Sequence, residues 1–171
     1  MYHQYMPFFA EFMRALKGGQ GIDYTWNVGI GSNFLALYVY YLASPFHWLG
    51  LVVPESHIME FLTYLVVFKI GLCGLSAYWY LCTRGQRWER TPVSTGIADT
   101  YKAGAALFFS MGYSLSGFMA AYNWNIMWLD CVILLPFIVM GLERLVFEGK
   151  PFLYCVMLGL SILTNYYISI M

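Results

Sequence analysis

The sequence predicts an all-α protein that crosses a membrane several times. Of its 171 residues, 60% are hydrophobic and only 11% are charged, whereas soluble domains carry about 25% charged residues. Long apolar runs alternate with short polar connections, and Trp and Asn gather where two of these runs meet, at 122–130. Trp prefers the boundary between lipid and water, so this stretch marks a membrane surface. The net charge of zero argues against a nucleic-acid partner.

Residues 1–57 are expected to form an external loop with helices that lie at the membrane surface. Residues 5–17 are apolar on one side and charged on the other, but they are fewer than the roughly 20 residues that a span needs. An amphipathic interfacial helix is therefore predicted there. In residues 34–53 a proline, Pro45, interrupts the apolar run, which favours two short interfacial helices over one span.

The remainder, 58–171, is expected to form membrane spans. We place four of them at about 58–82, 103–121, 131–147 and 151–171. The connection at 83–104 is the most basic one in the chain, so the positive-inside tendency assigns it to the cytoplasm. The turn at 122–130 and the N-terminal loop then lie outside. The chain shows no signal peptide and its last run has no polar exit, so we expect the last span to be truncated and the sequence to be part of a longer protein.

A Gly-rich stretch at 18–33 separates the first helix from the next. It lacks the GK[ST] of a P-loop and a GxGxxG fingerprint after a strand. It serves either as a flexible connection or as a substrate-facing loop. In the second interpretation its contacts would be polar and aromatic side chains, namely Asp23, Tyr24, Trp26 and Asn27.

Of the charged residues inside or beside the expected spans, Lys69 and Asp130 are candidates for a functional role. Lys69 stands near the centre of 58–82, where a charge costs roughly 3 kcal/mol or more. It either snorkels or pairs with a carboxylate to stabilise the fold, or it lies near an anionic lipid or phosphate group. Asp130 is the acid at the outer surface within the spans, and it either caps a backbone amide or takes a proton from a hydroxyl.

An ordered series of motifs resembles the bacterial YfhO family of membrane proteins. The motifs are MYHQYMPFF, WNVGIGSN, YYLASPFHWL, VVFKIGLCGL, GYSLSGFMAAYNWNIMWLD and TNYYIS. The resemblance implies a fold similar to the GT-C class of glycosyltransferases, which transfer sugar from a polyprenyl-phosphate carrier on the outer face of a multi-pass bacterial cell membrane. It also implies a cell-surface polymer such as lipoteichoic acid as the acceptor. The family's acidic residue usually stands just before the position of Met1, so we expect this fragment by itself to be inactive.

Under this resemblance the outer face holds the candidate site residues. Asp130 is the candidate catalyst, because inverting transfer needs a carboxylate that takes the acceptor's proton. The departing phosphate needs a cation, for which Lys69 or a divalent metal would serve, although no cofactor is established. No metal-ligand spacing is present, since the histidines at 3, 47 and 57 are far apart. The remaining candidates for sugar and carrier binding are His3, Gln4, Tyr5, Asp23, Trp26, Asn33, Asn123, Asn125, Asn165 and Tyr166.

Two other functions compete with a glycosyltransferase. In a transporter or flippase, Lys69 and the Gly-broken segments would line a path, and helices broken at mid-membrane would favour this interpretation. A non-catalytic membrane scaffold is the third alternative. Polar residues that gather on one face favour surface chemistry, and for the tryptophans a role as belt anchors competes with stacking on a sugar.

Overall fold

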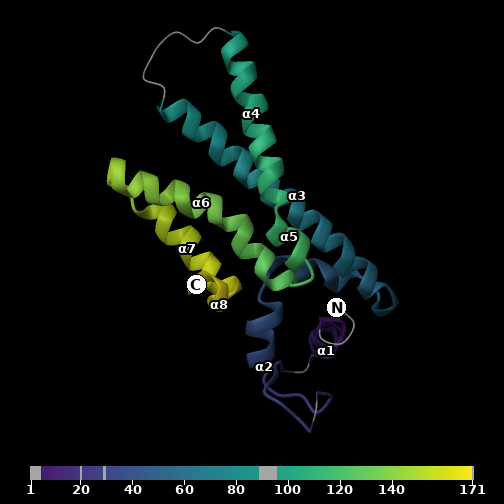
Figure 1. Cartoon of the computed structure of the whole chain (residues 1–171). Coiled ribbons are helices and arrows are strands. Elements are labelled where there is room, and N and C mark those ends of the chain that lie inside the picture. The colour runs from purple at the N-terminus through teal and green to yellow at the C-terminus, as the bar shows by residue number, and fades with distance from the viewer. Residues whose placement is uncertain (1–4, 20, 29, 89–95, 171) are drawn as a thin grey trace.

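The computed structural model describes residues 5–19, 21–28, 30–88 and 96–170, and its described residues are almost entirely helical (Figure 1). The single strand-like feature among them is an isolated bridge between Thr25 and Ser32. The all-α class predicted from the sequence is therefore confirmed. The helices are α1 (Tyr5–Lys17), α2 (Phe34–Leu37), η1 (Tyr38–Leu42), η2 (Pro45–Val52), η3 (Glu55–His57), α3 (Ile58–Trp88), α4 (Gly96–Ser114), α5 (Gly117–Tyr122), α6 (Ile126–Glu148), α7 (Phe152–Thr164) and α8 (Tyr166–Ile170).

Three helical stretches are long and apolar enough to cross a membrane. They are Glu55–Arg84, Lys102–Tyr122 and Ile126–Glu148. Helix α3 packs against both α4 and α6, and α6 packs against α7 along its length. Close approach is possible between α6 and α7 because Gly141 has no side chain: a Cβ there would lie 2.6 Å from the Tyr154 nitrogen. The multi-pass class is thus confirmed.

The segment at 34–53 forms two helical pieces that are bent sharply. The first, Phe34–Leu42, and the second, Pro45–Val52, meet at an angle of 104°. Ser44 is extended and Pro45 begins the second piece, as expected for a residue that lacks an amide hydrogen and suits a first helical turn. The division at Pro45 agrees with the sequence prediction. If the bent pair is one broken span, it adds a fourth candidate crossing.

Two boundaries differ from those expected. Helix α6 already begins at Ile126, so the turn between α5 and α6 is short and Asp130 lies one turn inside the helix. The stretch at 151–171 is interrupted at Asn165, which is extended and separates α7 from α8. Helix α7 has 13 residues, which amounts to about 20 Å against about 30 Å of hydrocarbon. A crossing by 151–171 stays a prediction.

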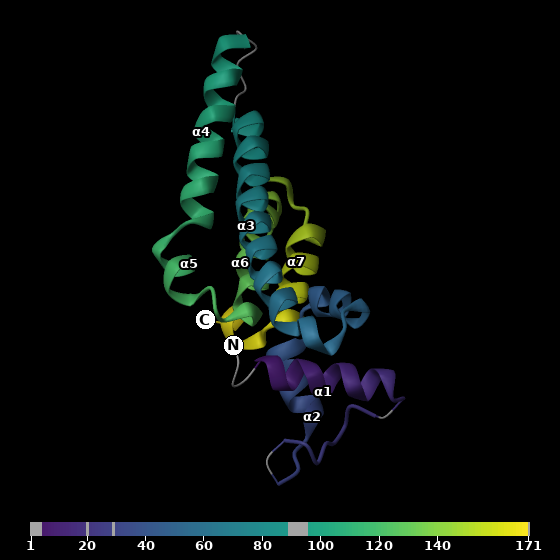
Figure 2. The ribbon, with the colours of Figure 1, turned by 90° about the vertical axis from the view of Figure 1, so that its right-hand side faces the viewer.

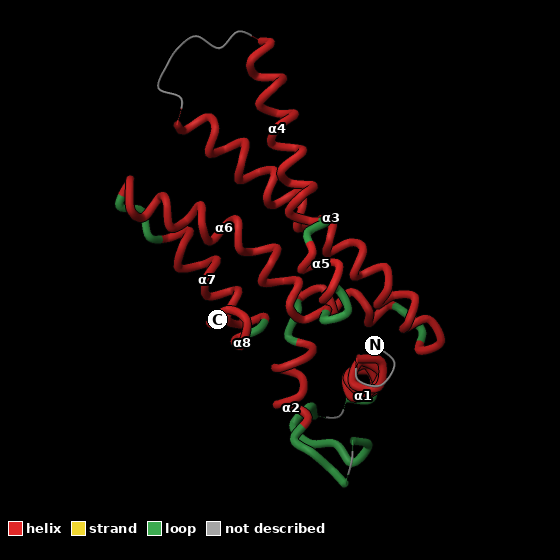
Figure 3. Tube along the Cα trace, viewed as in Figure 1, coloured by secondary structure: helices red, strands yellow, loops and turns green. Residues whose placement is uncertain are grey.

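Helix α1 lies crosswise to α3 at one end of the long helices (Figure 2). The loop that follows α1 extends beyond it and appears as the large non-helical region in Figure 3. The turn between α5 and α6 lies at this same end, whereas the ends of α3 and α4 that flank 89–95 lie at the other (Figure 1). Aromatic side chains of α1, including Phe9 and Phe12, are buried in one core with Leu62, Ile126 and Leu129. This packing fixes α1 to the spans.

Candidate functional site: a loop pocket and a buried ion pair

The Gly-rich loop is closed by a pair of backbone hydrogen bonds. The Thr25 amide donates to the Ser32 carbonyl over 3.0 Å, and the Ser32 amide donates back over 2.9 Å. Between them, Gly31 has a φ of +99°, a conformation that favours glycine. A Cβ at Gly31 would collide with the Tyr24 hydroxyl. The absence of a side chain at Gly31 lets Tyr24 pack over it. Tyr24 also lies edge-on against Trp26, with 5.1 Å between their ring centroids.

Glu11 of α1 holds this loop against the helix through hydrogen bonds. Its carboxylate accepts hydrogen bonds from the Thr25 hydroxyl and from the Asn27 side-chain amide, the latter at 3.0 Å to each oxygen. The Arg14 guanidinium, one helical turn further on, donates to it over 3.2 Å. Burial of a carboxylate requires such partners, because an unpaired charge in a low-dielectric region is costly. Of these partners, only Arg14 follows from the sequence, because its i,i+3 spacing from Glu11 places both on one helix face.

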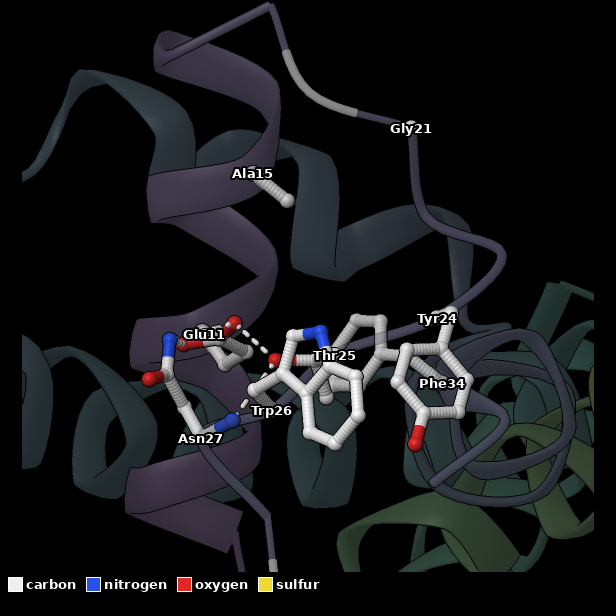
Figure 4. A pocket seen from close by; sticks show the side chains of 8 residues that line it. All are labelled: Glu11, Ala15, Gly21, Tyr24, Thr25, Trp26, Asn27 and Phe34. Carbon is white, nitrogen blue, oxygen red and sulfur yellow. Dashed lines mark hydrogen bonds between the residues drawn. The ribbon is translucent and has the colours of Figure 1, made fainter. Parts of the chain in front are cut away.

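A cavity of about 190 Å³ lies between α1 and the loop (Figure 4). Trp26 and Tyr24 form an aromatic wall that water reaches, since their exposed fractions are 76% and 50%. Pockets for drug-sized ligands have volumes of about 300–1,000 Å³, so this cavity suits a smaller ligand with both polar and apolar faces. The lining residues are Glu11, Ala15, Gly21, Tyr24, Thr25, Trp26, Asn27 and Phe34.

A second polar site lies inside the helical core and joins three elements. The Lys69 ammonium of α3 donates to Asp130 Oδ2 over 2.8 Å, to the Ile126 carbonyl over 3.1 Å and to the Ser44 hydroxyl over 3.0 Å. Lys69 is completely buried and Asp130 is 3% exposed. The ion pair thus ties α3 to the first turn of α6 and to the corner between η1 and η2.

One oxygen of this ion pair and one histidine ring nitrogen have no hydrogen-bond partner among the described residues. They are Asp130 Oδ1 and His47 Nε2, and both are buried. The other ring nitrogen of His47 lies 3.2 Å from the Leu42 carbonyl oxygen. The Phe46 ring adds a cation–π contact, with its centroid 5.6 Å from Lys69 Nζ. The pair is enclosed, and neither of its residues lines a described cavity.

Of the residues that the sequence indicated for substrate binding, Trp26 lines the loop pocket. The neighbouring Asp23 is exposed, and its carbonyl accepts the Phe34 amide. Asn33 caps α2 through a hydrogen bond from the Ala36 amide. Tyr5 is buried against Tyr41, and this burial raises the pKa of its hydroxyl. His3 and Gln4 lie outside the described residues.

The candidates at the α5–α6 turn and at the α7–α8 break do not come together at one site. Asn123 is the C-cap residue of α5 and Asn125 is the N-cap residue of α6. The Asn125 carbonyl accepts a hydrogen bond from the Trp128 amide. Asn165 is buried at the α7–α8 break and its side-chain oxygen accepts the Ile168 amide. Tyr166 is half-exposed, with its ring 6.4 Å from that of Tyr40. None of these four residues lines the loop pocket.

Sequence reasoning missed Glu11 as a site residue. A carboxylate in an amphipathic helix is expected to face solvent, and only the fold shows that Thr25 and Asn27 return to cover it. One available signal was the Gly-rich stretch after α1, which lets the chain turn back on the helix. In the part of the chain that the structure describes, no group of three or more His, Cys, Asp or Glu is placed to hold a metal.

These features define a multi-pass helical membrane protein with a polar pocket at one end of its spans. The family model described as bacterial membrane protein YfhO matches residues 1–171. The chain therefore belongs to the YfhO family of bacterial membrane proteins. Searches of curated proteins and of solved structures give no match.

Proposed function

We propose that this chain is part of a membrane glycosyltransferase that moves sugar from a polyprenyl-phosphate carrier to a cell-surface polymer, such as lipoteichoic acid, on the outer face. The loop pocket carries this proposal. It combines a buried carboxylate, side-chain hydrogen-bonding groups and an exposed tryptophan face within about 190 Å³. A sugar ring needs both kinds of contact, because its hydroxyls require hydrogen-bond partners and its C–H face packs on an aromatic ring.

The position of the pocket supports surface chemistry. Helix α1 lies across the end of the long helices, and the loop lies beyond it (Figure 2). A carrier with its lipid in the bilayer would present its sugar at this level, where polar groups are hydrated. The pocket residues come from α1 and from the loop, outside the three long candidate spans.

This proposal assigns sugar binding to Glu11 and gives Asp130, the candidate catalyst from the sequence, no contact with the sugar. Asp130 is enclosed and its Oδ2 is occupied by Lys69, so a bulky acceptor or carrier cannot reach it without a rearrangement of the helices. Glu11 borders the cavity, and sugar hydroxyls would replace hydrogen bonds that its oxygens now accept from Thr25 and Asn27. In this view Lys69 and Asp130 are positioning residues: their contacts hold the start of η2 and the start of α6 against α3.

The test is transfer of labelled sugar from a polyprenyl-phosphate donor by the full-length protein in membranes. Trp26→Ala is the most informative variant, because the exposed indole supports little of the fold. Loss of one stacking contact of about 1.4 kcal/mol predicts a roughly tenfold lower kcat/KM. Trp48→Ala, a half-exposed tryptophan in η2 that does not line the pocket, is the matched control.

Glu11→Gln supplies the second arm, because glutamine keeps the size of the side chain but removes the charge. We expect transfer to fall while thermal stability changes less than in Glu11→Ala. Equal transfer by the wild type, Trp26→Ala and Glu11→Gln would reject the assignment of this pocket. Absence of transfer by the wild type, with movement of a lipid-linked sugar across vesicles, would reject the enzymatic function.

A transporter or flippase is the second candidate, and a specific observation favours it. The apolar segment after Pro151 is broken at Asn165, whose side-chain nitrogen is buried without a hydrogen-bond partner among the described residues. Broken helices with buried polar atoms line the substrate paths of many transporters. The vesicle experiment separates this candidate from the first. A glycosyltransferase transfers sugar even in open membranes, whereas movement by a flippase can be detected only in sealed vesicles, where the two faces are separated.

A further inference from the structure

An open apolar groove lies at the start of α3 and shares no lining residue with the loop pocket. Its volume is about 440 Å³, and it is lined by Val53, His57, Glu60, Phe61 and Tyr64. The exposed fraction of Tyr64 is 74%, which is high for a large aromatic side chain. The aromatic part of the lining, Phe61 and Tyr64, belongs to the first two turns of a helix that is long enough to span the membrane.

The groove begins at the membrane boundary and continues toward the hydrocarbon. The candidate span starts at Glu55, so the charged residues of its first turn lie at the surface. Phe61 and Tyr64 follow at helical spacing and face the depth of lipid chains. A groove with this orientation has the shape for an acyl chain whose headgroup stays at the surface.

Two carboxylates near the groove have only loose partners, and of these Glu60 lines it. Glu60 Oε1 lies 3.9 Å from His57 Nδ1, and Glu55 Oε2 lies 3.9 Å from the Arg14 guanidinium. Both glutamate side chains are more than half exposed. Arg14 is the nearby cation, and it makes its shorter contact, 3.2 Å, with Glu11. Among the residues that line the groove, Glu60 carries a negative charge and no lysine or arginine balances it.

We propose that this groove binds a phospholipid with a primary ammonium headgroup, of the phosphatidylethanolamine class. The ammonium donates hydrogen bonds to Glu60, the His57 imidazole donates to the phosphodiester, and one acyl chain lies along Phe61 and Tyr64. A choline headgroup has no N–H to donate, and an anionic headgroup meets repulsion from the Glu60 carboxylate. This lipid site does not depend on the proposed glycosyl transfer.

The test is the lipid composition that the full-length protein retains. The protein is released from nanodiscs that contain equimolar phosphatidylethanolamine, phosphatidylcholine and phosphatidylglycerol, and bound lipids are counted by native mass spectrometry. We expect phosphatidylethanolamine to exceed phosphatidylcholine by about fivefold, the ratio that about 1 kcal/mol gives. Glu60→Gln should bring this ratio close to one.

A second variant keeps the test independent of the charge. Tyr64→Ala removes part of the apolar lining and should lower retention of every lipid. A photoreactive diazirine in the acyl chain should label residues 53–64 in the wild type and not in Tyr64→Ala. Matched controls lie elsewhere: Glu148→Gln at the far end of α6 and Phe108→Ala on an exposed face of α4. Preferential retention of phosphatidylglycerol, or a ratio unchanged by Glu60→Gln, would overturn the proposal.

Discussion

Lys69 and Asp130 are 61 positions apart in the chain, yet their charged groups meet at 2.8 Å in the middle of the helical core. Lys69 makes two further hydrogen bonds, to the Ile126 carbonyl and to the Ser44 hydroxyl. One ammonium group thus satisfies acceptors on three separate segments. This arrangement explains how a charge is tolerated within an apolar helix, because each proton of the ammonium has a partner.

Removal of one partner of this pair should destabilise the protein strongly. Lys69→Met leaves the Asp130 carboxylate buried and uncompensated, so we expect a loss of about 3–5 kcal/mol of unfolding free energy. Thermal or denaturant unfolding of the purified protein in detergent measures the loss.

The double variant Lys69→Met with Asp130→Leu serves as the control, because it removes both charges and leaves apolar volume. It should recover most of the lost stability, since apolar replacements of buried pairs are often neutral or stabilising. A double variant as unstable as Lys69→Met would show that the charges are needed for more than mutual compensation.

Gly31→Ala should open the loop while leaving the spans intact. The substitution adds a Cβ that collides with Tyr24 at a position with positive φ, and the φ alone costs about 1–2 kcal/mol. We expect faster hydrogen exchange at the Thr25 and Ser32 amides, which bond to each other's carbonyls. Exchange in α3 should not change.

Gly19→Ala isolates the collision from the backbone strain. Gly19 also has a positive φ, but no heavy atom lies within 4 Å of the point that a Cβ would occupy there. The substitution should therefore weaken the protein less than Gly31→Ala and leave exchange at Thr25 and Ser32 unchanged. Similar exchange in both variants would mean that Tyr24 does not pack over Gly31 in solution.

Gly141→Ala should weaken the contact between α6 and α7. The added methyl group would lie 2.6 Å from the Tyr154 nitrogen and 2.7 Å from its Cα, and backbone atoms cannot move aside independently. We expect a loss of about 1–3 kcal/mol from overpacking. Gly71→Ala is the matched control, since it is also helical and nothing lies near its Cβ position. Unfolding curves that coincide for the two variants would contradict the close packing.

Local patterns in the sequence predicted much of the fold. The 5–17 helix follows from its apolar face, and the break at Pro45 follows from a missing amide hydrogen. Each depends on neighbours in the chain, and so each can be recognised without the fold. The break at Asn165 was missed, because a single polar residue in an apolar run does not by itself end a helix.

The candidate site was less predictable than the fold. Tyr24, Trp26 and Asn27 could be grouped as neighbours, since they are adjacent in one loop, but Glu11 was not added to them. Its contacts with Thr25 and Asn27 depend on how the loop returns over α1, which no local pattern specifies. Pairing of Lys69 with a carboxylate was one of two alternatives, and a single sequence does not identify Asp130 as the partner.

The bond between Lys69 and Asp130 also bears on how the protein is made. During synthesis, α3 leaves the ribosome before α6, so the ammonium reaches the translocon before its partner exists. A lone lysine at a helix centre opposes insertion by about 2.5–3.5 kcal/mol. The remaining residues of α3 must overcome that resistance unaided, or the helix must wait beside the channel until the acidic residue arrives.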